Sequence, residues 1–347
     1  MSTGPTNGAL AELLAGAAEG EEGHRRRALR RAARAALRWP EEAEDLDRAG
    51  RPLTELRAVG PWVADRVRQW LDDPPAVPSP PQVRRGFLTR AEARRILAGR
   101  PSAPRARADL QMHSTWSDGT VSIEEMAARS TTLGREYVSI TDHSVGLPIA
   151  GGMDEATLLR QGVEIDRLNA AGAGPRILRS IEMNLSPEGQ GDMDPGVLRG
   201  LDLVLGAFHS KLRLTEDQTD RYLAAVRNPS VHVLAHPRGR RWDTRPGLRA
   251  DWPTVFEAAA EAGTALEIDS FPDRQDLQVE LLELAREAGV WISIGSDAHH
   301  PDELDHLEIG EAAAIRAGIP PDRILTLLPA EGVVAWAKAK RDRVSGP

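Results

Sequence analysis

Histidines and carboxylates recur in this chain at the ends of short apolar segments. The segment "ADLQMHSTWSDGT", residues 108–120, alternates apolar and polar residues up to His113 and then runs to Asp118. This alternation predicts a β-strand that ends at His113. Imidazole nitrogens and carboxylate oxygens bind divalent cations, so the pattern indicates metal-dependent chemistry. The chain has no cysteine, which excludes disulfides, thiolate metal sites and cysteine nucleophiles.

Seven strands are predicted, over residues 107–113, 137–143, 176–184, 201–209, 231–236, 264–269 and 291–299. Helical stretches at 123–133, 154–171, 216–226, 252–262 and 275–288 alternate with them, which favours a parallel sheet wrapped by helices. Six of the strands end on His113, Asp142-His143, Glu182, His209, His236 and Asp297-Ala298-His299. In a parallel barrel the carboxyl ends of the strands share one face, so we expect these side chains to converge there.

The remaining histidines are interpreted separately. His232 lies inside the fifth predicted strand, about 13 Å deeper than His236 by strand rise, and is expected to be buried and hydrogen-bonded. We expect His300 and His306 at the surface and His24 in an arginine-rich helix.

Charge divides the chain into two parts. Residues 1–107 carry 20 Lys and Arg against 14 Asp and Glu, whereas residues 108–347 carry 24 against 38. A basic part suits a polyanionic partner and an acidic part suits cations. The alternative is that the arginines cover solvated helix faces.

Residues 1–73 are expected to form a small helical domain. "HRRRALRRAARAALRW" has apolar residues at helical spacing, with Arg27 and Arg31 among the arginines that cover the remaining surface. The segment "LTELRAVGPWVADRVRQWL" resembles a helix-hairpin-helix, whose hairpin amides hold a DNA phosphate. Ala58 stands at the first glycine position of that motif and Gly60 at the second, so a plain helical hairpin is an equal interpretation.

Residues 74–107 form a linker rich in proline and arginine, with a short helix expected over 89–98. It is interpreted as a basic tether on nucleic acid or as a solvated connector. The chain has neither a long apolar run nor a signal-peptide pattern, so we expect a soluble cytoplasmic monomer without a membrane partner.

The motifs "DLQMHSTWSDG", "ITDHS", "IEMN", "GAFHS", "LAHP" and "SDAHH", in this order, resemble the PHP (polymerase and histidinol phosphatase) family. The resemblance is closest to the PHP domain at the C-terminus of bacterial family X DNA polymerases. It implies a distorted seven-stranded TIM-like (β/α)7 barrel over residues 108–347, a trinuclear metal site and phosphoester hydrolysis. The carboxylate motif of a polymerase palm is absent, and residues 73–108 leave no room for one, so we do not expect polymerase activity.

The resemblance implies three metal positions. The first would use Gln111, His113, Glu182 and Asp297, the second Glu182, His209 and His236, and the third Asp118, His143 and His299. The family most often has His-x-His where this chain has Gln111, and a glutamine oxygen is a weaker, neutral ligand or none. The expected ions are Mn²⁺ or Zn²⁺, with Fe²⁺ as a further candidate, and Gln111 shifts the preference toward Mn²⁺.

The implied mechanism assigns catalytic roles to Glu182, His209 and Asp297 in the cluster. Two metals would lower the pKa of a bridging water, and the third would bind phosphoryl oxygens. Arg238 or Lys211 could hold a phosphate oxygen, or either could be a solvent-facing cation. Asp269 is expected to orient a water or a metal-bound histidine.

Three functions follow from this interpretation. The first is a DNA phosphoesterase acting in repair as a 3′-to-5′ exonuclease, 3′-phosphatase or abasic-site endonuclease. The second is a small-molecule phosphatase resembling histidinol phosphatase, and the third is a non-catalytic DNA-binding protein. The charge division favours the first over the second, and the nearly complete ligand set favours an enzyme over the third.

Overall fold

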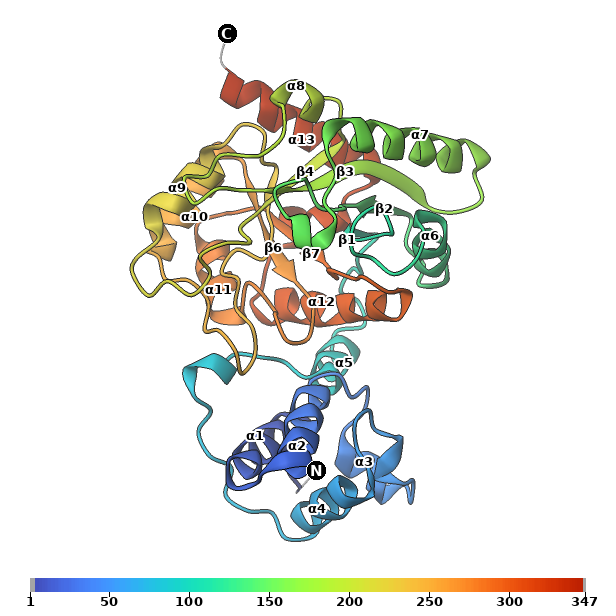
Figure 1. Cartoon of the computed structure of the whole chain (residues 1–347), viewed down its shortest axis with the longest axis vertical. Coiled ribbons are helices and arrows are strands. Elements are labelled where there is room, and N and C mark those ends of the chain that lie inside the picture. The colour runs from blue at the N-terminus through green and yellow to red at the C-terminus, as the bar shows by residue number, and fades with distance from the viewer. Residues whose placement is uncertain (1–3, 346–347) are drawn as a thin grey trace.

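A computed structural model, which describes residues 4–345, places a seven-stranded barrel above a helical module (Figure 1). All neighbouring strands are parallel and their spatial order is their sequence order. The strands are β1 (Ala108–Met112), β2 (Tyr137–Ile140), β3 (Arg176–Asn184), β4 (Leu203–Ala207), β5 (Val233–Leu234), β6 (Ala265–Asp269) and β7 (Ile292–Gly295). Each lies inside a predicted strand segment, so the predicted fold class is confirmed.

The barrel closes where the chain beyond β7 meets β1. The backbone N–H of Asp297 donates to the carbonyl of Gln111 at 3.1 Å, and the N–H of His113 donates to the carbonyl of Ala298 at 2.8 Å. These bonds lie past the last residue of β7, at the carboxyl end of the barrel. Closure therefore brings the first and last of the predicted metal-binding segments side by side.

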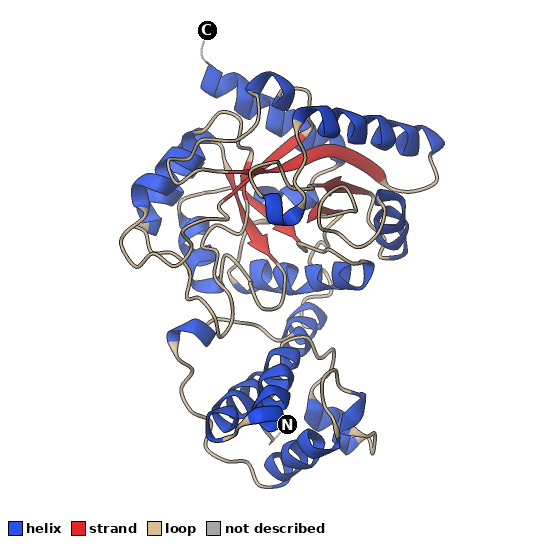
Figure 2. Cartoon of the chain, in the orientation of Figure 1, coloured by secondary structure: helices blue, strands red, loops and turns tan. Residues whose placement is uncertain are grey.

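Helices surround the strands, as Figure 2 shows in blue around red. The five predicted helices are confirmed as α6 (Ile123–Thr132), α7 (Glu155–Ala171), α9 (Thr219–Arg227), α10 (Trp252–Ala262) and α11 (Val279–Glu287). Ser122 and Glu125 form a capping box at the start of α6, and Asp154 caps α7. The structure adds α8 (Pro195–Leu198), α12 (Leu307–Arg316) and α13 (Ala330–Ser345), which were not predicted. No helix within residues 4–345 is long and apolar enough to cross a membrane.

Helix α13 covers the amino ends of the strands. Val333 and Ala337 of this helix are fully buried in one apolar cluster with Ala108, Leu203 and Ala265, which stand at or near the first positions of their strands. The opposite, carboxyl end of the barrel is thereby left for polar side chains.

The helical module has its own apolar core. It contains α1 (Asn7–Ala17), α2 (Gly23–Ala36), α3 (Ala43–Arg48) and α4 (Pro61–Asp72). Leu10, Leu29, Leu46 and Val67 are fully buried in this core, and Trp242 from the barrel is buried in it as well. Because the module and the barrel share apolar contacts, neither is a free-standing unit in this structure.

The predicted hairpin is present in altered form. A 3-10 turn, η2 (Leu53–Glu55), forms the first part of this segment, and the i, i+3 spacing of Leu53 and Leu56 buries both leucines in the module core. Ala58 has φ +63°, in the left-handed region that favours glycine. Gly60 then caps α4, with Pro61 at its first position. The helix-hairpin-helix assignment stays a prediction.

Several arginines of residues 84–107 pair with acidic side chains of the barrel. Helix α5 (Arg90–Ala98) packs against α12, and its Arg94 donates to the Glu308 carboxylate at 3.0 Å. Arg105 donates to Glu311, a carboxylate that is 5% exposed, at 2.6 Å. Acidic barrel side chains thus pair with Arg94 and Arg105, which are both exposed. The interpretation of the linker as a tether on nucleic acid or as a solvated connector stays a prediction. The proline-rich residues 74–81 are mainly exposed.

His306 is buried, so its predicted surface position is wrong. The 3-10 helix η5 (Pro301–His306) turns its ring edge-on against Phe271, with ring centroids 5.3 Å apart. Burial, together with the charges of Arg38, Arg90 and Arg57, lowers the pKa of His306 to about 3. The other three predictions are confirmed: His232 is buried and accepts from the Val204 N–H at 2.9 Å, and His24 and His300 are exposed.

We expect His306 to make the protein less stable in mild acid. The unfolded chain binds a proton at His306 near pH 6.5, whereas the folded chain does so only near pH 3, so the unfolding free energy falls as pH decreases below 6.5. Between pH 7 and pH 5 the loss from this residue is about 2 kcal/mol. We expect urea unfolding to show that the free energy of unfolding of His306→Asn falls between pH 7 and pH 5 by about 2 kcal/mol less than that of the wild type. His300→Asn, which alters an exposed ring, serves as the control, and equal losses in both variants contradict the prediction.

Candidate metal centre

The nine predicted metal ligands gather at the carboxyl end of the barrel. They come from β1, β3 and the segments that follow β1, β2, β4, β5 and β7. The side chains are Gln111, His113, Asp118, His143, Glu182, His209, His236, Asp297 and His299. The parallel register brings them together, because every strand enters the same mouth with the same polarity.

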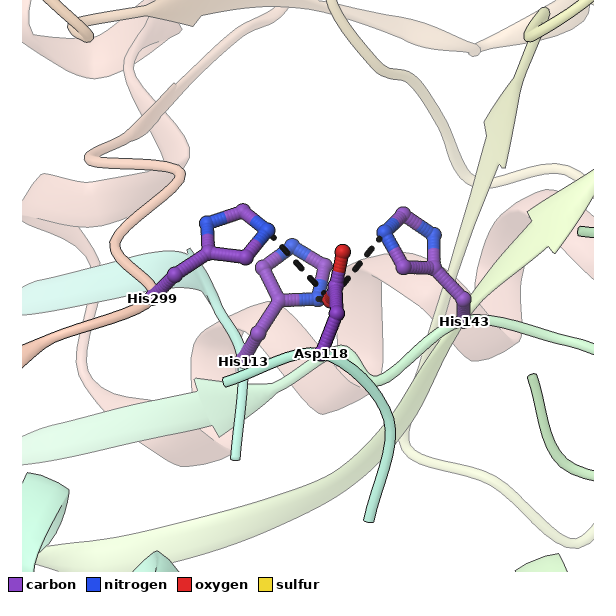
Figure 3. Close-up of side chains that lie close together, drawn as sticks. All are labelled: His113, Asp118, His143 and His299. Carbon is purple, nitrogen blue, oxygen red and sulfur yellow. Dashed lines mark ion pairs between the residues drawn. The ribbon is translucent and has the colours of Figure 1, made fainter. Parts of the chain in front are cut away.

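Asp118 is surrounded by three imidazoles (Figure 3). Its Oδ1 lies 3.3 Å from His299 Nε2, 3.5 Å from His143 Nε2 and 3.8 Å from His113 Nδ1. Gly119 permits the tight turn that carries Asp118 back over His113, since a Cβ there would lie 2.6 Å from the backbone of Ser114. The four side chains form one group of potential metal ligands.

Glu182 lies at the centre of the other contacts and is fully buried. Its Oε1 bonds His236 Nε2 at 2.8 Å and His209 Nε2 at 3.0 Å. Its Oε2 lies 3.4 Å from His113 Nε2 and 3.5 Å from His143 Nδ1. This carboxylate therefore touches four imidazoles, an arrangement compatible with the predicted bridging position.

Two further groups share Glu182. One contains His143, Glu182 and His209, and the other contains His113, Glu182 and Asp297. Within each of the three groups the candidate ligand atoms lie within 4.8 Å of one another. The three groups share more residues than the three predicted metal positions do, because His113 and His143 each belong to two groups.

Burial and the neighbouring charges shift the pKa values of the side chains in the cluster. Burial lowers the pKa of His143 to about 4. For Asp118, burial raises the pKa, but the hydrogen bond with His299 and the nearby imidazoles outweigh it and lower the value to about 2. Burial opposes a charge on His299, yet Asp118 and Asp297 raise its pKa to about 9. The carboxylates are thus ionised at neutral pH, and a bound cation would replace the His299 proton.

The donor set fits divalent cations. His113 Nδ1, His143 Nδ1 and Gln111 Oε1 are buried without a hydrogen-bond partner, which is costly unless a further group binds there. All donors are nitrogen or oxygen, the set that suits Mn²⁺, Zn²⁺ or Fe²⁺. The Gln111 amide nitrogen donates to Glu182 Oε2 at 3.1 Å, so this side chain already reaches the first predicted position.

Arg238 does not reach the cluster, contrary to its predicted catalytic and phosphate-binding role. All three guanidinium nitrogens are engaged: Nη2 donates to the Pro246 carbonyl at 3.0 Å, Nε to Leu248 at 3.4 Å, and Nη1 to Gln278. The backbone after β5 turns the side chain toward α11, where it is nearly buried. Lys211 is exposed on the loop after His209, so its phosphate contact stays a prediction.

Asp269 contacts an arginine instead of a histidine. It is fully buried, its Oδ1 accepts from the Phe271 N–H at 2.7 Å, and its Oδ2 lies 3.7 Å from Arg274 Nη1. Burial and the charge of Asp297 raise its pKa well above the ordinary range. These contacts do not include a histidine, and the predicted alternative, orientation of a water, stays a prediction.

Several residues at the mouth were not predicted. Arg274 Nη1 binds Asp297 Oδ2 at 2.9 Å, and Asn184 Oδ1 lies 3.1 Å from His209 Nδ1. Burial and the charges of Arg274, Arg241 and Arg213 lower the pKa of Arg245, which stands on the loop after β5. Asn184 could have been found as the last residue of "IEMN", but the arginines stand in loops without a spacing signal.

Comparisons with known proteins give related sequences and a solved structure. The chain is 39% identical over 233 residues to the DNA polymerase/3′-5′ exonuclease PolX of Bacillus subtilis, covering 67% of this chain and 41% of that protein. It is 34% identical over 166 residues to a probable phosphatase of Tolumonas auensis, covering 45% of this chain and 65% of that protein. The crystal structure of histidinol phosphate phosphatase from Lactococcus lactis is also similar, with a TM-score of 0.46, 18% identity, and coverage of 61% of this chain and 94% of that one.

The chain thus spans 41% and 65% of the length of these two curated relatives. No protein-family model matches it. The chain is related to PolX and to probable phosphatases, and its seven parallel strands carry the ordered histidine and carboxylate motifs to one mouth. These findings support the predicted resemblance of the chain to the PHP family.

Proposed function

We propose that this protein is a metal-dependent hydrolase of phosphoester bonds that acts on DNA. The observation that carries the proposal is the set of three overlapping ligand groups, which share His113, His143 and Glu182 at the barrel mouth. Bound divalent cations would supply a Lewis acid for phosphoryl oxygens and an ionised water near neutral pH. We propose three ions, with Mn²⁺ or Zn²⁺ as the candidates.

The residues of the chain have distinct roles in this proposal. Glu182, held by His209 and His236, fixes the centre of the cluster. Asp118 is 36% exposed and lies on the solvent side, where a phosphoryl group would approach. Arg213, Arg241 and Arg245 stand on the loops that follow β4 and β5, at the carboxyl end of the barrel, where they would attract a polyanion.

The helical module offers a second basic surface. Arg27 and Arg31 are exposed on α2, as are Arg26 and Arg30, whereas Arg34 lies 3.6 Å from Asp273 of the barrel. The outer arginines are therefore available to phosphates, and the backbone around Ala58 and Gly60 would supply amides at the start of α4. The similarity to PolX, whose name includes a 3′-5′ exonuclease, supports DNA as the substrate.

The proposal is tested by metal-dependent hydrolysis. The metal-free full chain is supplied with Mn²⁺ or Zn²⁺ and assayed on 3′-hydroxyl, 3′-phosphorylated and abasic DNA and on p-nitrophenyl phosphate. We expect release from at least one DNA substrate that depends on the metal and falls steeply with salt. Hydrolysis of p-nitrophenyl phosphate alone would support the small-molecule phosphatase, and DNA binding without turnover would support the non-catalytic alternative.

An exposed apolar side chain stands beside the mouth. Ile149 is 93% exposed in the turn η4 (Pro148–Ala150), which belongs to the loop between β2 and α7. The loop is closed on itself by the Met153 N–H, which donates to the His143 carbonyl at 2.8 Å. A Cβ placed on Gly151 would lie 3.9 Å from the carbonyl oxygen of Ser117, next to Asp118. Ile149 is thus held near the ligands and open to an apolar contact with a base.

We expect Ile149→Ser to raise KM for an oligonucleotide about 3- to 10-fold, because an apolar contact with a base is worth about 1 kcal/mol. The KM for p-nitrophenyl phosphate is expected to stay unchanged, since that substrate has no base. Leu159→Ser, which alters another exposed apolar side chain on α7, is the matched control. Equal effects on both substrates would show that Ile149 does not contact a base.

A further inference from the structure

The loop after β6, residues 270–276, touches the metal centre on one side. Arg274 projects from it, and its Nη1 lies 2.9 Å from Asp297 Oδ2 and 3.7 Å from Asp269 Oδ2. The other oxygen of Asp297, Oδ1, lies 3.2 Å from His113 Nε2. Arg274 therefore holds one oxygen of Asp297 and turns the other toward the group formed with His113 and Glu182.

The same loop touches the helical module and the linker on its other side. The Arg38 guanidinium of the segment after α2 lies 4.8 Å from the centroid of the Phe271 ring. Gln275, 5% exposed, accepts from the Leu88 N–H at 2.7 Å and donates to the Leu88 carbonyl at 2.8 Å. The contacting residues lie on both sides of Arg274 in the sequence: Phe271 is three residues before it, and Gln275 directly follows it.

Asp273 completes the connection. Its carboxylate is almost fully buried and lies 3.6 Å from Arg34 of α2 and 3.2 Å from Arg241. Its carbonyl accepts from the N–H of Trp242, whose ring is buried in the core of the helical module. Contacts with Arg34 and Arg38 of the helical module, with Leu88 of the linker and with Trp242 thus fix the loop that carries Arg274.

We propose that Arg274 is a positioning residue for the metal centre and that docking of the helical module sets its place. This inference rests on the proposed function, because it connects the module that would bind DNA with the site that would cleave it. A partner of a metal ligand orients that ligand, and losing such a partner typically weakens metal affinity 10- to 100-fold. The module would then control the first metal position through Arg274 and Asp297 without touching either ion or substrate.

The test measures Mn²⁺ binding to the full chain by the electron paramagnetic resonance signal of free Mn²⁺. Arg274→Gln is expected to weaken the site that includes Asp297 about 10- to 100-fold, and Arg274→Lys to restore part of the affinity. Gln275→Ala and Arg38→Ala, which only loosen the loop, are expected to weaken it about 3- to 10-fold. Arg176→Ala breaks an ion pair of 2.7 Å with Glu331, which lies outside this loop and outside the helical module, and is the matched control with unchanged affinity.

Thermal unfolding of each variant checks that the fold is retained. Wild-type affinity in Arg274→Gln would overturn the positioning role. Weakened binding in Arg274→Gln with wild-type binding in Gln275→Ala and Arg38→Ala would overturn the coupling to the module. Because the readout is metal binding, a chain that binds Mn²⁺ as expected but hydrolyses no phosphoester would overturn the proposed function and leave the positioning role standing.

Discussion

Glu182→Gln is expected to lower metal-dependent hydrolysis at least about 1,000-fold. The substitution keeps the size of the side chain and removes the one carboxylate that contacts four imidazoles. A neutral amide binds a cation more weakly and presents only one acceptor oxygen, so the central ligand of two groups is impaired. A loss of this size corresponds to about 4 kcal/mol of transition-state stabilisation. The measurement is kcat/KM for DNA and for p-nitrophenyl phosphate at saturating Mn²⁺.

Glu164→Gln is the matched control for this substitution. Glu164 also bears a carboxylate near the mouth, but it accepts from Trp116 Nε1 at 2.7 Å, a bond that an amide oxygen can keep. We expect near wild-type rates in the control and full loss in Glu182→Gln on both substrates. Activity of Glu182→Gln within tenfold of wild type would mean that the cluster is not the catalytic centre.

Reversing the charge of the outer face of α2 is expected to lower kcat/KM for DNA about 100-fold. The variant carries Glu at Arg26, Arg27, Arg30 and Arg31, which are exposed. If each arginine neutralises a phosphate, the slope of log affinity against log salt falls by about 3 to 4. The same variant is expected to hydrolyse p-nitrophenyl phosphate at the wild-type rate, because these side chains are on the helical module.

Substitution is a better test of this surface than removal of residues 1–107. Deleting them would uncover the face of α12 that α5 covers and take away Leu88 and Leu97, which are buried in the barrel core. The matched control carries Lys at the same four positions and keeps the charge, so DNA turnover and its salt dependence are expected to stay near wild type. A charge-reversed variant that cleaves DNA as wild type does would remove the module from substrate binding and favour the mouth arginines alone.

The sequence by itself determined the barrel and most of the candidate ligands. Six of the seven predicted strands end on His, Asp or Glu, as at His113, His143 and His209. In a parallel barrel the direction of the chain decides which end of a strand reaches the mouth, so local order in the sequence is enough to predict convergence. Glu182 and Asp297 could be named for the same reason, without knowledge of any long-range contact.

Only the tertiary structure decided which groups the arginine and loop histidine side chains contact. Arg238 and Arg274 both follow strand ends, yet one is engaged by Pro246 and Gln278 and the other pairs with Asp297. Arg90 and Arg94 in the basic linker pair with Glu308, more than two hundred residues away, and His306 is buried against Phe271. The partner of a long, flexible arginine or of a histidine on a loop is a residue that is distant in the sequence and that the fold brings close. The local spacing of residues therefore does not predict it.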